Sequence, residues 1–213
     1  MKIYGISGLG ADKRVFSFLN LDDEIIAVDW IKPKQKESLK NYSKRLSSVI
    51  NNEEDFCIIG VSFGGLVATE ISKILKPKMT ILVSSVHTKN EMRTIYRVLG
   101  KFKIIPLLPK FLFNPPKGIA SYLFGAQNKV LLNEILDDTD LYFAKWAVNE
   151  LLTWDNTSNL ENVVKINGTH DKLIPPRGST KMKCIHKGTH FMIVDHANEV
   201  SELIHNIIYN KRY

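Results

Sequence analysis

Six short runs of apolar residues recur along the chain, separated by turns or by segments with helical spacing. They lie at residues 2–7, 24–28, 55–59, 79–84, 163–167 and 181–185. Short apolar runs bounded by turn residues are typical of strands that are buried on both faces of a parallel sheet. The pattern therefore predicts six strands.

Apolar residues at helical spacing mark several of the intervening segments. We expect a short helix at 14–19, an amphipathic helix at 36–51 and a buried helix at 65–75. A terminal helix is expected at 198–209, with Asp195 near its start as the capping residue. Strands that alternate with helices predict an α/β fold in which helices cover a parallel sheet.

The alternation stops after Val86, and some seventy residues pass before the next strand-like run. Helical patterns fill this gap at 94–99, 117–123, 129–136 and 141–153. An insertion of this length between sheet strands is usually functional. We therefore expect a single domain at residues 1–213, with a helical lid insertion at about 87–160 beside the carboxyl ends of the strands.

The composition is that of a globular protein with one core. With 213 residues and 44% hydrophobic content, the chain needs no disulfide framework or metal to fold. Its two cysteines, Cys57 and Cys184, predict no disulfide, and no cysteine pattern indicates zinc. Residues 1–6 lead directly into a strand rather than into a secretory signal, so we expect a cytoplasmic location.

The formal charge of +7 is distributed unevenly. Residues 89–117 contain seven Lys or Arg and one acid, whereas residues 133–161 contain seven Asp or Glu and one Lys. Such segments are typical of two solvated faces, and no nucleic-acid-binding motif accompanies the basic one. We expect no nucleic-acid partner.

A glycine-rich turn follows the first strand at residues 7–10 (Ser-Gly-Leu-Gly). The turn does not match a dinucleotide fingerprint, because Lys13 stands where the third glycine belongs. No cofactor is expected.

The most informative motif is Gly-Val-Ser-Phe-Gly at residues 60–64, which lies between an apolar run and a helical run. A sharp strand-to-helix turn holds Ser62 in a sparsely populated backbone conformation, and small flanking residues let the two elements approach each other. The helix amino terminus favours negative charge beside the hydroxyl. We therefore interpret Ser62 as a nucleophile.

A serine nucleophile needs a base and a third group that orients the base. Among six histidines, His190 is best placed because it follows the last strand, and Asp171 follows the preceding strand. His170 is its direct neighbour and is expected to point elsewhere. A metal site built from these residues and His186 is an alternative, but no pair has helical ligand spacing.

Three motifs together resemble those of the α/β-hydrolase family. They are Gly-Val-Ser-Phe-Gly at 60–64, Gly-Thr-His-Asp-Lys-Leu-Ile-Pro at 168–175 and Gly-Thr-His-Phe at 188–191, in the family's chain order. The resemblance covers the whole chain. It implies a strand order of 2-1-3-4-5-6, with Ser62 as nucleophile, Asp171 as acid and His190 as base.

The resemblance also implies that the oxyanion hole uses the backbone N–H groups of Leu9 and Phe63. Two features depart from the family pattern. Ser7-Gly8 stands where His-Gly is usual, and this difference affects the orientation expected for the Leu9 N–H. The early antiparallel hairpin of larger members is missing, so a minimal sheet of about six strands is expected.

These motifs predict a serine hydrolase that acts on a small-molecule carboxylic ester or thioester through an acyl-enzyme. A non-catalytic ligand-binding or interaction protein with the same fold is the alternative. The sequence leaves open the substrate, the oligomeric state, and whether the enzyme instead performs C–C bond hydrolysis or acyl transfer.

Basic and apolar residues alternate within the expected lid. The apolar set is Phe102, Ile104, Ile105, Leu107, Leu108, Phe111, Leu112 and Phe113, punctuated by Lys101, Lys103, Lys110 and Lys117. Prolines break the run, so it cannot be one amphipathic helix. We expect a mobile cap whose apolar residues face the pocket and whose lysines face water, without membrane contact.

Overall fold

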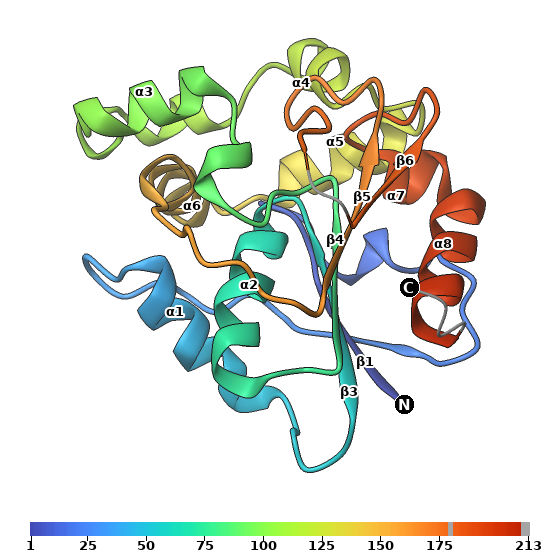
Figure 1. The fold of residues 1–213 in the computed structure, drawn as a ribbon. Helices are drawn as coiled ribbons and strands as arrows, with labels where there is room; N and C mark the ends of the chain where they lie inside the picture. Colours follow the sequence, from blue (N-terminus) through green and yellow to red (C-terminus); the bar gives the residue numbers. More distant parts are fainter. Residues whose placement is uncertain (179–180, 210–213) are drawn as a thin grey trace.

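A computed structural model describes residues 1–178 and 181–209. Its centre is a six-stranded, wholly parallel sheet in the order β2-β1-β3-β4-β5-β6 (Figure 1). The strands are β1 (Lys2–Ile6), β2 (Ile25–Ala27), β3 (Phe56–Val61), β4 (Met79–Val83), β5 (Val163–Gly168) and β6 (Met182–Ile185). Each begins and ends within two residues of its expected bounds, and the predicted spatial order is confirmed.

Eight α-helices and five short 3-10 helices lie in the described part of the chain. The α-helices are α1 (Leu39–Leu46), α2 (Phe63–Leu75), α3 (Thr94–Phe102), α4 (Lys117–Phe124), α5 (Lys129–Asp138), α6 (Leu141–Thr153), α7 (Met192–Asp195) and α8 (Ala197–Tyr209). The 3-10 helices are η1 (Lys13–Val15), η2 (Ser47–Val49), η3 (Lys89–Glu91), η4 (Ile105–Leu107) and η5 (Lys110–Phe113).

Alternating strand residues enter two cores on opposite faces of the sheet. Ile59 and Ile81 pack in one core, where α5, α7 and α8 cover the sheet. Ile58 and Leu82 pack in the other, where α1, α2 and α6 cover it. Figure 1 shows α1 and α2 on one side of the strands and α8 on the other. This double burial explains why the strands read as continuous apolar runs.

Three local expectations differ from the structure. The helix expected at 36–51 begins after Ser38, whose Oγ accepts a hydrogen bond from the Asn41 N–H, and it tightens into η2 at its end. The helix expected at 14–19 is the single turn η1. Asp195 was expected to cap the terminal helix, but its carboxylate accepts the N–H groups of Gln127 and Asn128 before α5.

The segment between β4 and β5 is helical, and much of it lies beyond the carboxyl ends of the strands (Figure 1). Within it, α5 and α6 bury apolar side chains against the body of the protein. By contrast, α3 buries only Gly100 and η5 buries no residue. The outer part of the insertion is therefore α3, η4 and η5, which stack on α6.

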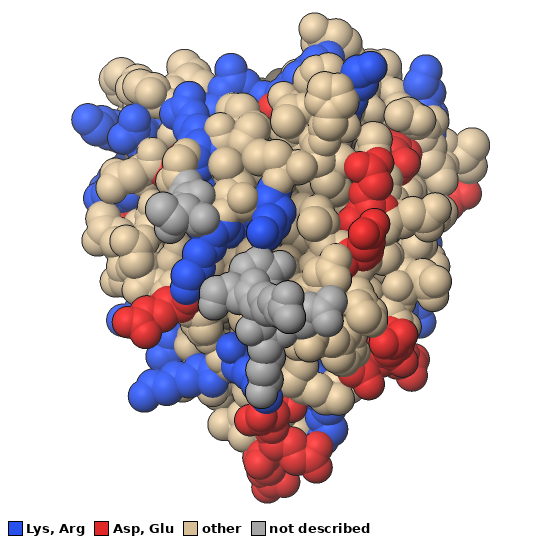
Figure 2. Space-filling model, turned by 45° about the vertical axis from the view of Figure 1, so that its right-hand side comes forward, with Lys and Arg blue, Asp and Glu red and all other residues tan. Residues whose placement is uncertain are grey.

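Charge is unevenly distributed on the surface. In Figure 2, Lys and Arg side chains occur along the upper part of the molecule, at the height of α3 and α4 in Figure 1, and also down its left side, whereas Asp and Glu are more frequent at the right side and the lower end. Among the described residues, no helix is long and apolar enough to cross a membrane.

Candidate active site

Ser62 lies at the turn where β3 ends and α2 begins. Its φ of 51° is on the left-handed side of the Ramachandran map, which non-glycine residues rarely adopt. The Ser62 N–H donates to the Val83 carbonyl at 2.9 Å, and the Ser62 carbonyl accepts from Ser85 Oγ at 2.7 Å. These bonds hold the unusual backbone conformation in place, as the strand-turn-helix motif predicts.

The glycines of the motif permit close approach of neighbouring backbone. A Cβ on Gly60 would stand 2.6 Å from the Cα of Gly65, where the strand meets the helix. A Cβ on Gly64 would stand 2.1 Å from the carbonyl oxygen of Ser7. No side chain fits at either position. The start of α2 is thus pressed against both its own strand and the loop after β1.

Ser62, His190 and Asp171 form one chain of hydrogen bonds. His190 Nε2 lies 2.9 Å from Ser62 Oγ, and His190 Nδ1 lies 2.9 Å from Asp171 Oδ2. The His190 side chain is 4% exposed and the Asp171 side chain 0% exposed, whereas Ser62 is half-buried at the cavity wall. The structure brings together the three residues that sequence analysis assigned to nucleophile, base and acid.

Both carboxylate oxygens of Asp171 are occupied. Oδ1 accepts the N–H groups of Leu173 and Ile174 at 2.9 and 2.8 Å, which leaves Oδ2 directed at His190. The loop after β5 therefore holds the Asp171 carboxyl group in a fixed orientation towards His190 Nδ1.

Two loops from neighbouring strands are held together to make this contact. The His170 N–H donates to the Gly188 carbonyl at 2.9 Å, and the Lys187 N–H donates to Thr169 Oγ1 at 2.8 Å. These bonds fix the loop that carries Asp171 against the loop that carries His190.

The two expected oxyanion donors lie beside Ser62. Phe63 is the first residue of α2, so its N–H is among those that have no acceptor within the helix. Leu9 lines the same cavities as Ser62, and a Cβ on the adjacent Gly8 would be 3.4 Å from the Ser62 Cβ. Both residues therefore lie close to Ser62, where the cavity opens.

Ser7, which departs from the family pattern, has a structural role of its own. Its buried Oγ donates to the Ala11 carbonyl at 2.7 Å, and the Trp30 indole N–H donates to the same carbonyl at 3.0 Å. The two bonds close the loop that contains Leu9. A serine at this position thus braces the loop.

A cavity of about 340 Å³ opens at Ser62 and His190. Its walls are mostly apolar and come from α3, η5, α6 and the loop after Asp171, with Tyr96, Phe113, Leu151 and Leu173 among them. A volume of this size, apolar walls and few polar groups are typical of small-molecule sites.

A second cavity of about 60 Å³ also reaches Ser62 and His190. It is lined by Val15, Leu132, Ile135 and Phe191, and it shares Ser62 and His190 with the larger cavity. Phe124 and Leu136 line both cavities, so Ser62 stands where a large and a small apolar space meet.

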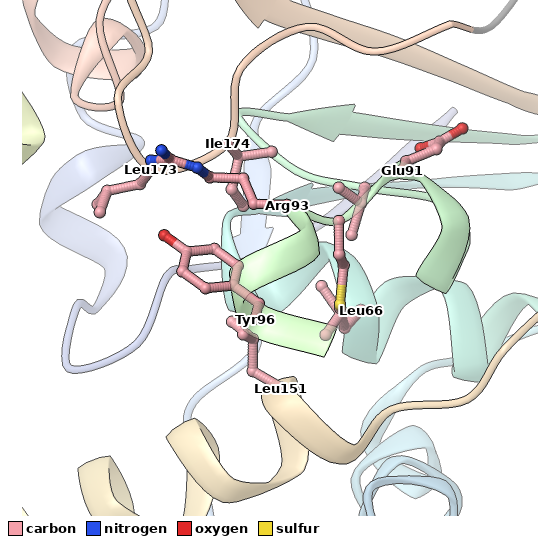
Figure 3. Close-up of a pocket in the computed structure, with 9 residues that line it drawn as sticks. Leu66, Glu91, Arg93, Tyr96, Leu151, Leu173 and Ile174 are labelled. Atoms are coloured by element: carbon pink, nitrogen blue, oxygen red, sulfur yellow. The ribbon is translucent and has the colours of Figure 1, made fainter. Parts of the chain in front are cut away.

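The amino-terminal end of α3 is fixed to the loop that contains Asp171. The Arg93 guanidinium donates to the Lys172 carbonyl, next to Asp171. Figure 3 shows Arg93 and Tyr96 beside Leu173 and Ile174, around a void of only about 10 Å³ that holds at most one water. Burial is the main cause that raises the pKa of Tyr96 above its usual value. Tyr96 therefore presents a neutral hydroxyl to the wall of the larger cavity.

The apolar residues of segment 102–113 do not all face the cavity, contrary to expectation. Leu112 and Phe113 line it. Leu107 and Phe111 are 84% and 66% exposed, and Phe102 is 68% exposed. The 3-10 turns η4 and η5 are too short to bury one consistent face, so their side chains point in several directions.

The remaining histidines near the strand ends lie outside the hydrogen-bonded chain. His87 is buried, and its Nε2 accepts the Leu160 N–H at 3.1 Å. His170 and His186 are exposed, with ring centroids 6.5 Å apart. In residues 1–178 and 181–209, no group of three or more His, Cys, Asp or Glu is placed to hold a metal ion.

Sequence reasoning missed the residues that contact the site from the insertion. The Phe124 ring meets the His190 ring edge-on at 5.3 Å, and the Phe191 N–H donates to the Phe124 carbonyl at 3.2 Å. Tyr96 was also missed. These contacts are far apart in sequence, and no local motif marks them. Ser85, the second residue after β4, had a detectable signal in its position at the carboxyl end of a strand.

Solved structures share the arrangement of this chain. A hydrolase from Oleispira antarctica matches with a TM-score of 0.73 and 18% identity, covering 99% of this chain and 92% of that chain. A meta-cleavage product hydrolase from Pseudomonas fluorescens matches at 0.71 and 14%, with 100% and 92% covered. A lipase-esterase related protein from Clostridium acetobutylicum matches at 0.69 and 16%, with 97% and 94% covered.

Comparison of the sequence with protein-family models and with curated proteins found no match. At identities of 14 to 18%, the structural likenesses establish the fold. The chemistry has to be argued from the residues around Ser62.

Proposed function

We propose that this chain, which has the α/β-hydrolase fold, is a serine hydrolase that cleaves a carboxylic ester or thioester through an acyl-enzyme. One observation carries the proposal: Ser62 Oγ and Asp171 Oδ2 lie 2.9 Å from opposite nitrogens of the same imidazole. A half-buried serine with a buried histidine and aspartate arranged in this way is suited to nucleophilic catalysis.

The reaction begins when Ser62 Oγ attacks the substrate carbonyl carbon. The hydroxyl proton moves to His190 Nε2, and Asp171 stabilises the imidazolium that forms. His190 then gives the proton to the departing alcohol or thiol, which leaves the acyl group on Ser62. A water molecule repeats the sequence, with His190 again acting as base, and releases the acid.

The negative oxygen of the tetrahedral intermediate requires fixed hydrogen-bond donors. In this proposal the N–H groups of Phe63 and Leu9 supply them. The amino terminus of α2 adds a favourable partial charge. Ser7 and Trp30 support this role indirectly, because both bond to the Ala11 carbonyl and hold the loop of Leu9.

The substrate is expected to be predominantly apolar on both sides of the scissile bond. The cavities of about 340 and 60 Å³ meet at Ser62, and their walls are mainly aliphatic and aromatic. A large apolar group fits the first cavity, and a smaller group fits the second. The helical segment that contains Tyr96 and Phe113 acts as the lid of the larger cavity.

A screen of p-nitrophenyl esters and matched thioesters of graded acyl length tests the proposal. The wild-type protein should hydrolyse at least one series, and Ser62→Ala should lower kcat/KM by at least about a thousandfold. Ser48→Ala, which alters an exposed serine elsewhere, is the control and should have no effect. A protein that binds these compounds but turns none over would instead be a non-catalytic binding protein.

A further inference from the structure

The insertion exposes several large apolar side chains. They belong to α3, η4, η5 and α4, and we call the outward side of these four elements the basic apolar surface. Its exposed apolar residues include Ile95, Phe102, Leu107, Phe111, Ile119 and Tyr122. Clusters of exposed large apolar side chains are rare on proteins that stay surrounded by water, and they mark interaction sites.

The same segment carries most of the net charge of the protein. Residues 93–124, from the residue before α3 to the end of α4, contain six Lys or Arg and no Asp or Glu. Subtracting these six from the 29 Lys and Arg of the whole chain leaves 23, against 22 Asp and Glu. The rest of the molecule is therefore formally close to neutral, and most of the positive excess lies in this segment.

Cationic and apolar residues alternate at its most exposed points. Lys101 and Lys103 flank Phe102, and Lys110 precedes Phe111. In the described part of the chain, no ion pair within 4.0 Å involves Lys101 or Lys103, whereas Lys117 pairs with Asp137. Figure 2 shows Lys and Arg side chains at the height of the molecule where α3 and α4 lie.

We propose that the basic apolar surface docks on a bilayer that contains anionic phospholipid. Apolar side chains that stand out singly from short turns can enter the acyl boundary, while neighbouring ammonium groups remain at the headgroup phosphates. Each Lys or Arg near an anionic surface adds to the attraction. An acidic protein partner would satisfy the charge, but side chains as exposed as Leu107 would need matching pockets.

The sequence-based expectation of no membrane contact assumed that these side chains face the cavity. In the structure Leu112 and Phe113 do so, whereas Phe102, Leu107 and Phe111 point away from it. Docking would place the cavity rim at the lipid surface, so that an apolar ester could enter directly from the bilayer. This delivery step rests on the proposed hydrolase function, but the docking itself does not.

Vesicle co-sedimentation tests the docking with the whole protein. Vesicles of phosphatidylglycerol and phosphatidylcholine should bind it at least about tenfold more tightly than pure phosphatidylcholine vesicles at about 0.15 M salt. Binding to the anionic vesicles should weaken at about 1 M salt. Failure to bind anionic vesicles, or equal binding to both kinds, overturns the proposal.

Paired variants locate the surface. Lys101→Glu with Lys103→Glu should weaken binding by about 25-fold or more, and Phe102→Ser, Leu107→Ser and Phe111→Ser together by at least about tenfold. Lys40→Glu with Lys44→Glu changes net charge equally on exposed positions of α1, and Val49→Ser removes a 61% exposed side chain on η2. These controls should bind within about twofold of wild type.

Equal loss of binding in the control variants would show that the net charge acts without a defined surface, and it would overturn the proposal. Analytical ultracentrifugation tests for a dimer that Leu107→Ser dissociates. Such a dimer would also overturn the proposal, because a second copy of the chain would then cover the surface. Hydrolysis of a soluble p-nitrophenyl ester without vesicles is measured in parallel. Vesicle binding without hydrolysis refutes the hydrolase proposal alone, and hydrolysis without vesicle binding refutes the docking alone.

Discussion

Gly168 and Gly188 touch each other across the two loops that carry Asp171 and His190. A Cβ on Gly168 would lie 2.1 Å from the Gly188 carbonyl oxygen, which no real side chain tolerates. The same carbonyl accepts the His170 N–H. This contact sets the separation between the loop that carries Asp171 and the loop that carries His190.

Gly168→Ala should therefore separate Asp171 from His190. We expect kcat/KM to fall by at least about tenfold and the free energy of unfolding to fall by about 1–3 kcal/mol, because backbone has to move. Gly118→Ala is the matched control, because no atom lies within 4 Å of its Cβ position at the start of α4. Ester hydrolysis and urea unfolding measure both effects, and normal activity in Gly168→Ala would contradict this explanation.

Asp171→Asn should preserve the shape of the site but abolish most of its catalytic activity. The amide would donate to His190 Nδ1 and leave the proton on Nε2, so the imidazole could no longer accept the proton of Ser62. We expect kcat to fall by about a thousandfold or more.

Asp195→Asn is the control for Asp171→Asn. It weakens the bonds to the N–H groups of Gln127 and Asn128, away from the hydrogen-bonded chain. It should lower the midpoint of thermal unfolding while kcat stays within a few-fold of wild type. Comparable losses of kcat in both variants would show that the Asp171 effect is structural.

Phe113→Ala should alter the preference for substrate size. Phe113 lines the cavity of about 340 Å³, whereas Phe111, two residues earlier, is 66% exposed and lies outside it. Removal of the Phe113 ring widens the cavity, so kcat/KM should fall several-fold for short esters and shift towards bulkier ones. Phe111→Ala is the control and should leave the profile of soluble esters unchanged, and the reverse outcome would contradict the cavity assignment.

His87 makes stability depend on pH. Burial is the main cause that lowers the pKa of His87 below its usual 6.5, so the folded protein holds it neutral and its Nε2 accepts the Leu160 N–H. Because the unfolded chain binds the proton more readily, the stability from His87 is present above pH 6.5. It is lost as the pH falls from 6.5 to the lowered pKa of the folded state.

Urea midpoints at pH 7.5 and 5.5 measure this dependence. Wild type should lose more stability on acidification than His87→Gln, by at most about 1.4 kcal/mol per pH unit below 6.5. His170→Gln, which alters an exposed histidine, should lose as much stability as wild type when the pH is lowered from 7.5 to 5.5. Equal losses in wild type and His87→Gln would show that His87 does not carry the effect.

The sheet was predictable because its four central strands, β1, β3, β4 and β5, are buried on both faces and therefore read as apolar runs. The relative positions of Ser62, Asp171 and His190 were predictable because each follows a strand, and the carboxyl ends of parallel strands meet at one edge. The orientation of segment 102–113 was not, because its prolines and 3-10 turns leave no periodicity from which a buried face could be inferred.

Contacts between distant segments were also beyond sequence reasoning. Asp195 lies in a position where a helix cap is reasonable, but its oxygens reach the N–H groups before α5 instead. The edge of Phe124 against His190 depends on how α4 packs on the loop before α7. Neither interaction follows from local spacing, since each requires the tertiary arrangement.

The proposed function depends on Ser62 being a nucleophile that His190 activates. Fluorophosphonates react with activated serines, so labelling followed by peptide mass mapping identifies the nucleophile. We expect one adduct on Ser62 in the wild-type protein, none on this position in Ser62→Ala, and labelling at least about a hundredfold slower in His190→Gln. A wild-type protein without an adduct, or with its adduct on another residue, would show that Ser62 is not the nucleophile.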